Sequence, residues 1–133
     1  MCKRVFLGLL VVVFLFPSIV LAGRARHVHL EKEYQAVWCV EHKGIQEVRL
    51  PDRARVDCVT ETHAVEAEFA YKWAESIGQS LYYASQTQKR AGILLIIERT
   101  KDQAFVDRLE STIKLMNLPI DVWKVDSSVF SKQ

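Results

Sequence analysis

Apolar and polar residues follow two different periods along the first part of the chain. Residues 30–40 carry large apolar side chains at helical spacing among helix-forming residues, which predicts a helix. Stretches with strand character follow at residues 45–50, 54–59 and 64–68, each separated from the next by a turn. This pattern predicts one helix followed by three strands in meander order.

The period changes after the third predicted strand. Over residues 70–85 the apolar residues recur at helical spacing, which predicts a long helix with one buried stripe that packs on the sheet. Residues 86–92 are polar and basic and are expected to form a loop. The continuous apolar run at residues 93–97 is typical of a central strand that is buried on both faces.

The last part of the chain adds one helix and one strand. An amphipathic helix is predicted for residues 102–116, with a cap at Thr100 or Asp102, and a final strand for residues 120–125. The end of the chain from Ser127 is expected to be a frayed tail. The order αβββαβαβ predicts an α/β fold, a single domain with a central mixed sheet flanked by helices.

The beginning of the chain differs from the rest. Residues 1–22 have a basic start, an apolar run interrupted by Pro17, and the small residue Ala22 before a polar continuation, which predicts a secretory signal peptide. A transmembrane anchor is the alternative, because the run is nearly long enough to span a bilayer. Cleavage after Ala22 would leave residues 23–133 as one exported domain, periplasmic or secreted, without a membrane attachment.

The overall charge depends on this cleavage. The full chain has 18 basic and 16 acidic side chains and a formal net charge of +2, with 50% hydrophobic residues. Lys3 and Arg4 leave with the signal peptide, so the mature chain carries equal numbers of basic and acidic residues. A neutral domain lacks the strong positive field of a nonspecific nucleic-acid binder, although local basic clusters can remain.

Two cysteines remain after cleavage, Cys39 in the first helix and Cys58 in the second strand. An exported protein meets an oxidising environment, which makes the pair a disulfide candidate. Two unpaired, buried thiols are the alternative. A disulfide would tie the first helix to the second strand.

Carboxylates occupy positions in the second and third predicted strands where they need a physical explanation. Asp57 lies in the middle of a strand between apolar neighbours, which is costly unless the carboxylate is paired or binds a cation. Glu66 and Glu68 are two residues apart and therefore share a face of the third strand. Converging carboxylates favour a hard divalent cation such as Mg²⁺. The alternative is a solvated strand face, with Asp57 paired to Arg55 or Arg49.

The following helix carries polar residues on a stripe of its own. Lys72, Gln79 and Tyr83 are separated by seven and four residues, so they lie near one line along the helix and apart from its apolar stripe. Lys72 lies in the first turn, where a cation is unfavourable for the helix dipole. A nearby cluster of carboxylates would explain this position.

In these features the chain resembles the PD-(D/E)XK nuclease-like superfamily, the fold of many restriction enzymes and RecB-type nuclease domains. The core of that family has the order αβββαβ, and its motif is an aspartate on the second strand followed by an acidic residue, a spacer and a lysine on the third. Asp57 takes the place of the aspartate, and Glu66 takes that of the acidic residue. Glu68 stands at the lysine position, so either Lys72 has migrated to the helix, a second glutamate serves, or the site is inactive.

The RecB-like members of this family add two accessory features. Their Gln-x-x-x-Tyr stripe on the next helix is matched by Gln79 and Tyr83. They also place a glutamate on the first helix, for which Glu33 or Glu31 would stand. The resemblance covers roughly residues 30–98.

The resemblance implies an exported, metal-dependent nuclease that hydrolyses nucleic-acid phosphodiesters, with Mg²⁺ or Mn²⁺ as cofactor. Asp57 and Glu66 would bind the metal, and Glu68 would assist as a ligand or base. Lys72 would stabilise the attacking water or the scissile phosphate, and Gln79 would position the other groups. The neutral mature charge and export away from cellular DNA favour the alternative, a catalytically inactive binding protein that retains the fold.

Basic residues flank this predicted site in adjacent turns. Arg49, Arg53 and Arg55 lie around the first turn of the meander, and Lys89 with Arg90 lies in the loop after the long helix. These side chains would contact phosphates if the protein binds nucleic acid. The alternative is a set of solvated surface charges.

Overall fold

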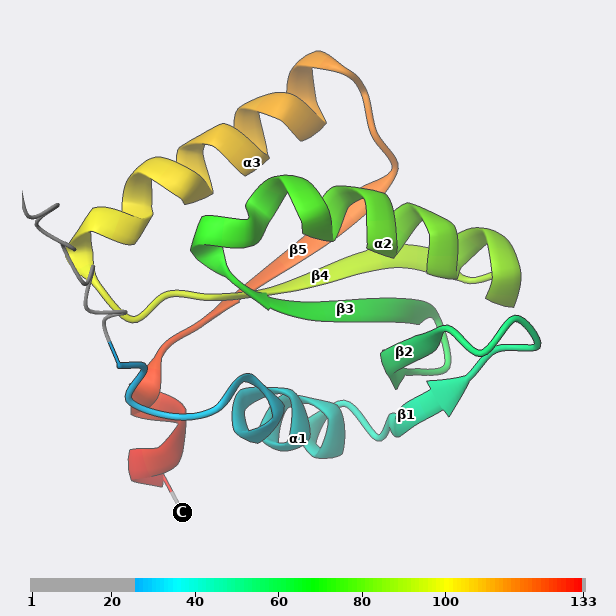
Figure 1. The fold of residues 1–133 in the computed structure, drawn as a ribbon, viewed down its shortest axis with the longest axis horizontal. Coiled ribbons are helices and arrows are strands. Elements are labelled where there is room, and N and C mark those ends of the chain that lie inside the picture. The colour runs from blue at the N-terminus through cyan, green and yellow to red at the C-terminus, as the bar shows by residue number, and fades with distance from the viewer. Residues whose placement is uncertain (1–25, 133) are drawn as a thin grey trace, which may run out of the picture.

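A five-stranded mixed sheet with helices against both faces forms the described part of the chain, which is residues 26–132 of a computed structural model (Figure 1). The predicted signal peptide at residues 1–22 lies outside the described residues. Within residues 26–132, no helix is both long and apolar enough to cross a membrane. The strands are β1 (Ile45–Arg49), β2 (Arg55–Val59), β3 (His63–Phe69), β4 (Arg90–Ile96) and β5 (Ile120–Val125). The helices are α1 (Glu31–Glu41), α2 (Trp73–Thr87) and α3 (Gln103–Leu115), with 3₁₀ turns η1 (Ala70–Lys72), η2 (Thr100–Asp102) and η3 (Ser127–Lys132).

The strands lie in the sheet in the same order as in the chain. β1 pairs with β2 and β2 with β3 in antiparallel fashion. β3 pairs with β4 and β4 with β5 in parallel fashion. The two parallel connections pass through α2 and α3, as parallel strands require a crossover. This arrangement confirms the predicted order αβββαβαβ and the mixed sheet.

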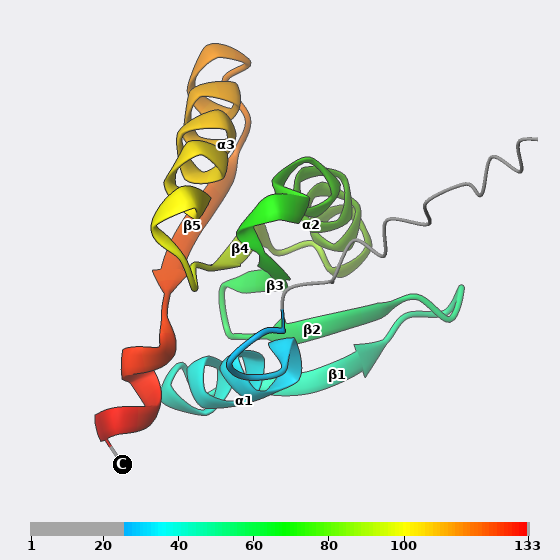
Figure 2. The same ribbon diagram turned by 60° about the vertical axis from the view of Figure 1, so that its left-hand side comes forward.

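The helices divide between the two faces of the sheet, with α1 on one side and α2 and α3 on the other (Figures 1 and 2). On the α2 and α3 side, Ile93 and Leu95 of β4 pack with Leu109 of α3. On the α1 side, Leu94 packs with Trp38. β4 is therefore buried on both faces, as the apolar run predicts.

The alternation of β3 directs its glutamates away from α1. Val65 and Ala67 pack in the cluster that contains Trp38, on the α1 side of the sheet. Ala64 packs against Tyr83 of α2, on the opposite side. Because side chains alternate along a strand, Glu66 and Glu68 share the face of Ala64.

Cys39 of α1 and Cys58 of β2 form a disulfide, with their Cα atoms 5.8 Å apart. Both residues are buried in the cluster between α1 and the sheet. The bond confirms the predicted pairing and fits an exported protein, since disulfides persist in oxidising environments.

Gly44 lies directly against this disulfide and is expected to tolerate no side chain. A Cβ atom there would lie 2.4 Å from Sγ of Cys58 and 2.7 Å from Sγ of Cys39. Gly44→Ala should therefore lower the free energy of unfolding by about 1–3 kcal/mol, measured by urea denaturation without reductant. Gly78→Ala is the control, because a Cβ at Gly78 would meet nothing within 4 Å and should stabilise the exposed interior of α2. Equal stability of Gly44→Ala and the parent would contradict the close contact.

Two boundaries differ from the predicted ones. α2 continues to Thr87 and β4 begins at Arg90, so the loop predicted for residues 86–92 is only two residues long. Gln88 ends the helix in the left-handed conformation, with a φ of 56°. Gln86 and Thr87 of this stretch complete α2, and residues 90–92 form the beginning of β4.

The end of the chain is ordered, which corrects the expectation of a frayed tail from Ser127. Residues Ser127–Lys132 form η3, and Phe130 packs on the ring of Tyr34 in α1, with the centroids 5.0 Å apart. Phe130 also contacts His29, whose ring centroid is 3.9 Å away. Burial of this one aromatic side chain fixes the last turn against α1.

Candidate functional site

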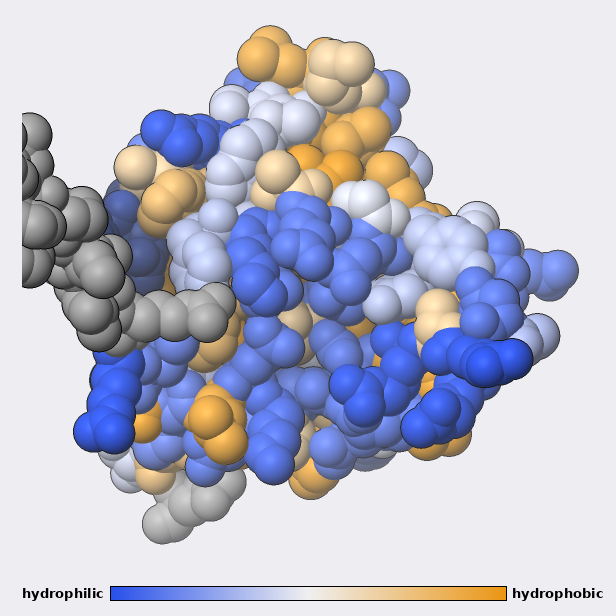
Figure 3. Space-filling view, viewed as in Figure 1, coloured by the Kyte–Doolittle hydropathy of each residue, from blue (hydrophilic) through white to orange (hydrophobic). Residues whose placement is uncertain are grey.

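A polar cleft with a volume of about 420 Å³ lies between α1, the β1–β2 hairpin, β3 and α2. The face of the molecule over these elements is covered by hydrophilic side chains (Figure 3). The residues that line the cleft are Glu31, Arg49, Arg53, Arg55, Asp57, Glu66, Glu68, Lys72, Glu75, Gln79 and Tyr83. The fold thus brings together the predicted residues of the second and third strands, the long helix and the first helix, apart from Glu33.

Asp57 lies at the point where the pairing of β2 and β3 changes. The backbone pairs of these strands are Cys58 with Val65 and Val59 with Ala64. At the residue before Cys58, Oδ2 of Asp57 accepts a hydrogen bond of 2.8 Å from the backbone N–H of Ala67. Burial raises the pKa of the Asp57 carboxyl to about 6, although this hydrogen bond opposes the rise.

Glu66 lies beside Asp57 on β3, and only 5% of it is exposed. Burial is the main cause that raises the pKa of Glu66 to about 9, and the charge of Asp57 contributes to this rise. The two carboxyl groups lie within hydrogen-bonding reach of each other. A proton on one of the two groups relieves the repulsion between them.

Glu68 and Lys72 form an ion pair at the end of β3, with 3.0 Å between Oε2 and Nζ. Oε1 of Glu68 accepts a hydrogen bond from the backbone N–H of Phe69. The hydrogen bond to Glu68 raises the pKa of Lys72, so its ammonium group remains charged. This contact explains why a lysine is favourable at the start of α2 despite the helix dipole.

Glu31 is the acidic residue that α1 contributes to the cleft. Burial is the main cause that raises the pKa of Glu31 to about 8, and a hydrogen bond with Glu68 contributes to this rise. Glu33 lies outside the cleft, where its Oε2 accepts a hydrogen bond of 2.6 Å from the backbone N–H of Leu30 at the start of α1. Of the two predicted candidates, Glu31 therefore meets the carboxyl cluster and Glu33 caps the helix.

Gln79 and Tyr83 lie one turn apart on the face of α2 that borders the cleft. Nε2 of Gln79 donates to the Tyr83 hydroxyl over 3.5 Å, whereas the buried Oε1 of Gln79 has no hydrogen-bond partner in the described part of the chain. Burial raises the pKa of Tyr83 to about 12, and the charge of Glu66 contributes to the rise. An unsatisfied buried oxygen is costly, and it gives the cleft an acceptor for a ligand.

Among the described residues, the arginines that line the cleft all belong to the β1–β2 hairpin or the turn between its strands. Arg55 pairs with Glu47, with 2.7 Å between Nε and Oε2, and Asp57 forms no ion pair with an arginine within residues 26–132. The expectation that Lys89 and Arg90 flank the site is wrong. Nζ of Lys89 donates to the carbonyl of Glu61, and Arg90 pairs with Asp121, at the other end of β3 and β4.

Gln35 is a residue of this region that sequence reasoning missed. It lies in α1 one turn after Glu31, and only 3% of it is exposed. Its Nε2 donates to Oε1 of Glu47 over 2.8 Å and to the carbonyl of Asp57 over 2.7 Å. A single buried amide therefore links α1 to both strands of the hairpin beside the cleft. The one available signal is a glutamine on the apolar face of the predicted helix.

Replacing Gln35 with methionine should destabilise the protein by about 1–3 kcal/mol, because the buried carbonyl of Asp57 and the more exposed carboxylate of Glu47 lose their donor. The measurement is the free energy of unfolding in urea. Gln103→Met is the matched control, since Gln103 is exposed and its Nε2 bonds only to Asp107 one turn along α3. Equal effects of the two substitutions would show that the Gln35 contacts contribute nothing specific.

The donor set of the cleft fits a hard divalent cation. Within residues 26–132, no three His, Cys, Asp or Glu side chains are placed so that they could hold a metal ion as they stand. The four carboxyl groups instead form two pairs, Asp57 with Glu66 and Glu31 with Glu68. Carboxylate oxygens are the ligands that Mg²⁺ binds, so the groups of the cleft match such a cation in kind.

Comparison with known proteins provides no family for this chain. No protein-family model, no curated protein and no solved structure matches it. Any functional assignment therefore depends on the chemistry of the cleft.

Proposed function

We propose that the protein is an exported, divalent-metal-dependent hydrolase of nucleic-acid phosphodiesters. One observation carries the proposal: buried carboxyl groups from β2 and β3 converge with the half-buried Glu31 of α1 in a cleft that also presents Lys72 and three arginines. Groups whose pKa is raised by burial reduce the stability of the fold at neutral pH. Such clusters in clefts are typical of functional sites.

Each residue of the cleft has a chemical role in this proposal. Asp57 and Glu66 would hold Mg²⁺ or Mn²⁺, which supplies an activated water and offsets charge at the phosphate. Glu68, whose two oxygens are already oriented by Lys72 and a backbone N–H, serves as a further ligand or as the base. Lys72 places its ammonium group beside the attacked phosphate, and Gln79 orients the other groups.

The arginines of the hairpin provide the contact with substrate. Arg49, Arg53 and Arg55 are exposed and line one wall of the cleft. Arginine binds phosphate through a planar set of donors, so these side chains are suited to a phosphodiester backbone. They supply the local positive charge that the neutral mature chain otherwise lacks.

Export is part of the proposal. The disulfide between Cys39 and Cys58 and the signal-like sequence of residues 1–22 both support a periplasmic or secreted location. The enzyme would then act on nucleic acid outside the cytoplasm.

A second candidate is an inactive binding protein that has kept the same fold and cleft. The observation that favours it is the ion pair between Glu68 and Lys72, which occupies the lysine with a partner inside the cleft. This candidate predicts binding of nucleic acid without hydrolysis.

A cleavage assay on the mature protein distinguishes the two. Single-stranded DNA, duplex DNA and RNA are incubated with Mg²⁺, with Mn²⁺ or with a chelator. The proposal expects cleavage with metal only, and Lys72→Met should reduce the rate about 100-fold or more, since it removes the charge at the phosphate. Lys101→Met, at an exposed lysine of η2, should leave the rate unchanged. Metal-independent cleavage, or none under any condition, would reject hydrolysis by this cleft.

The raised carboxyl pKa values predict how stability depends on pH without metal. Glu31 and Glu66 have folded-state pKa values of about 8 and about 9, against 4.5 for an ordinary glutamate carboxyl, so the native state keeps protons that the unfolded chain has lost. Stability should therefore fall between about pH 5 and pH 9 by up to about 1.4 kcal/mol per unit of pKa difference, less for the half-exposed Glu31. Calorimetric unfolding in chelator tests this. Glu66→Gln should flatten the curve, and a parent curve that rises over this range would contradict it.

A further inference from the structure

Three aromatic rings lie nearly parallel where β3 passes into α2, next to the residues Glu68 and Lys72 that line the cleft. The rings of His27 and Phe69 are stacked, with centroids 3.7 Å apart and planes inclined by 20°. The ring of Tyr71 lies 5.9 Å from His27 and 6.1 Å from Phe69, inclined by 13° to each. The ring of Tyr71 therefore lies nearly parallel to the stacked pair and beside it. We call His27, Phe69 and Tyr71 the aromatic step.

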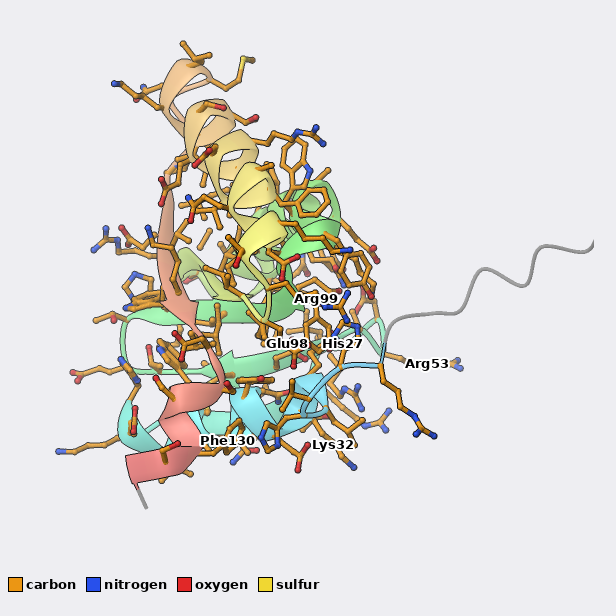
Figure 4. All side chains as sticks on the ribbon, turned by 90° about the vertical axis from the view of Figure 1, so that its left-hand side faces the viewer. His27, Lys32, Arg53, Glu98, Arg99 and Phe130 are labelled. Atoms are coloured by element: carbon orange, nitrogen blue, oxygen red, sulfur yellow. A yellow bond between two sulfur atoms is a disulfide. The ribbon has the colours of Figure 1, made fainter. Side chains whose placement is uncertain are left out.

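The two inner rings of the aromatic step are fixed in place. Phe69 is buried with Tyr34 and Ile96 in the core. Nδ1 of His27 lies 2.7 Å from Oε2 of the buried Glu98, and Figure 4 shows the two side chains adjacent. Tyr71 thus has a rigid, preorganised neighbour on one side.

Tyr71 itself presents a large aromatic surface to solvent. It is 44% exposed, whereas Phe69 is only 7% exposed. It directly precedes Lys72, whose ammonium group lies in the cleft on Glu68. An aromatic face at this position is next to the place where the proposed function puts the scissile phosphate.

The opposite end of the cleft is lined by charge. α2 runs from the aromatic step toward the β1–β2 hairpin (Figure 1). Lys72, Gln79 and Tyr83 line the cleft together with the arginines of this hairpin. Eleven residues of helix separate Lys72 from Tyr83, a length of about 16 Å. The cleft therefore extends from Lys72, which directly follows Tyr71, past the carboxyl cluster to the arginines of the hairpin.

We propose that Tyr71 is a base-stacking platform and that the cleft binds single-stranded nucleic acid in preference to duplex. The inference rests on the proposed function and specifies its substrate. An exposed aromatic ring gains by stacking on a base only when the face of the base is free, which is true of single strands and not of the interior of a duplex. The mature chain carries no net positive charge, so it lacks the field on which sequence-independent duplex binding depends.

The test measures binding without hydrolysis. Fluorescence anisotropy in chelator at low salt compares a labelled single-stranded oligonucleotide, a duplex of the same sequence, and an abasic strand of the same length. Tyr71→Ala should weaken binding of the single strand about tenfold, as expected for loss of one stacked base, and Tyr71→Phe should bind like the parent. Leu115→Ala is the control, because Leu115 is an exposed apolar side chain on α3 and does not line the cleft.

The outcomes separate this inference from the proposed function. Equal affinity of Tyr71→Ala and the parent for the single strand, an equal loss for the abasic strand, tighter parent binding to duplex, or no binding of the single strand at all would each overturn the platform. Metal-dependent cleavage by the parent with any of those results would leave the hydrolase standing. The expected loss on Tyr71→Ala in a protein that never cleaves would support the platform and reject hydrolysis.

Discussion

Replacing Asp57 with asparagine should abolish metal binding and hydrolysis while leaving the metal-free protein at least as stable as the parent. The substitution removes a buried negative charge beside Glu66, whose ionisation Asp57 opposes. The asparagine oxygen can still accept the hydrogen bond that Oδ2 of Asp57 accepts from Ala67. The main local contact therefore survives, and Glu66 no longer lies beside a buried negative charge.

Asp57→Ala separates the structural contribution of this residue from its charge. Alanine leaves the buried N–H of Ala67 without its acceptor, so this variant should lose about 1–3 kcal/mol relative to Asp57→Asn. Both free energies are measured by urea denaturation in chelator, and metal binding by the change in melting temperature with Mn²⁺. Destabilisation by Asp57→Asn, with no effect of metal on the parent, would mean that Asp57 has a structural role only.

Removing the disulfide should cost about 3 kcal/mol, since the bond closes a loop of about 20 residues in the unfolded chain. The double variant Cys39→Ala/Cys58→Ala, compared with the oxidised parent in urea, measures this. The bond joins α1, which carries Glu31 and Gln35, to β2, which carries Asp57. Its loss should therefore also weaken metal binding.

Thiol counting provides the control for the disulfide. The oxidised mature parent should show no reactive thiol after denaturation, and the parent treated with reductant should unfold at the same urea concentration as the double variant. Two reactive thiols in the exported, unreduced parent, or equal stability of parent and variant, would refute the bond as a stabilising element.

Local periodicity was sufficient to predict most of the elements and part of the cleft. The last strand, Ile120–Val125, matches its predicted bounds, because Pro119 and charged neighbours delimit its alternation. Glu66 and Glu68 share a face of β3 because strand geometry requires it. The line from Lys72 to Tyr83 follows from helical spacing alone. In each case the determining interaction lies within one element.

Features that depend on contacts between elements could not be predicted in this way. Glu31 and Glu33 are equivalent candidates by composition, and it is the packing of α1 on the sheet that brings Glu31 to the cleft. Lys89 and Arg90 follow α2 in sequence, yet they lie at the end of β3 remote from Glu68. The pairing of Phe130 with Tyr34 joins residues from opposite ends of the described chain.

Calorimetric titration of Mn²⁺ into the mature protein, in two buffers of different ionisation enthalpy, tests the central claim most directly. If the carboxyl cluster is a metal site, Mn²⁺ displaces the protons that Glu31 and Glu66 retain at about pH 7. The parent should then bind Mn²⁺ with release of protons to the buffer, more tightly at higher pH, and Asp57→Asn should bind none. Absence of binding by the parent, or equal binding by Asp57→Asn, would contradict the assignment of this cleft as a metal-dependent active site.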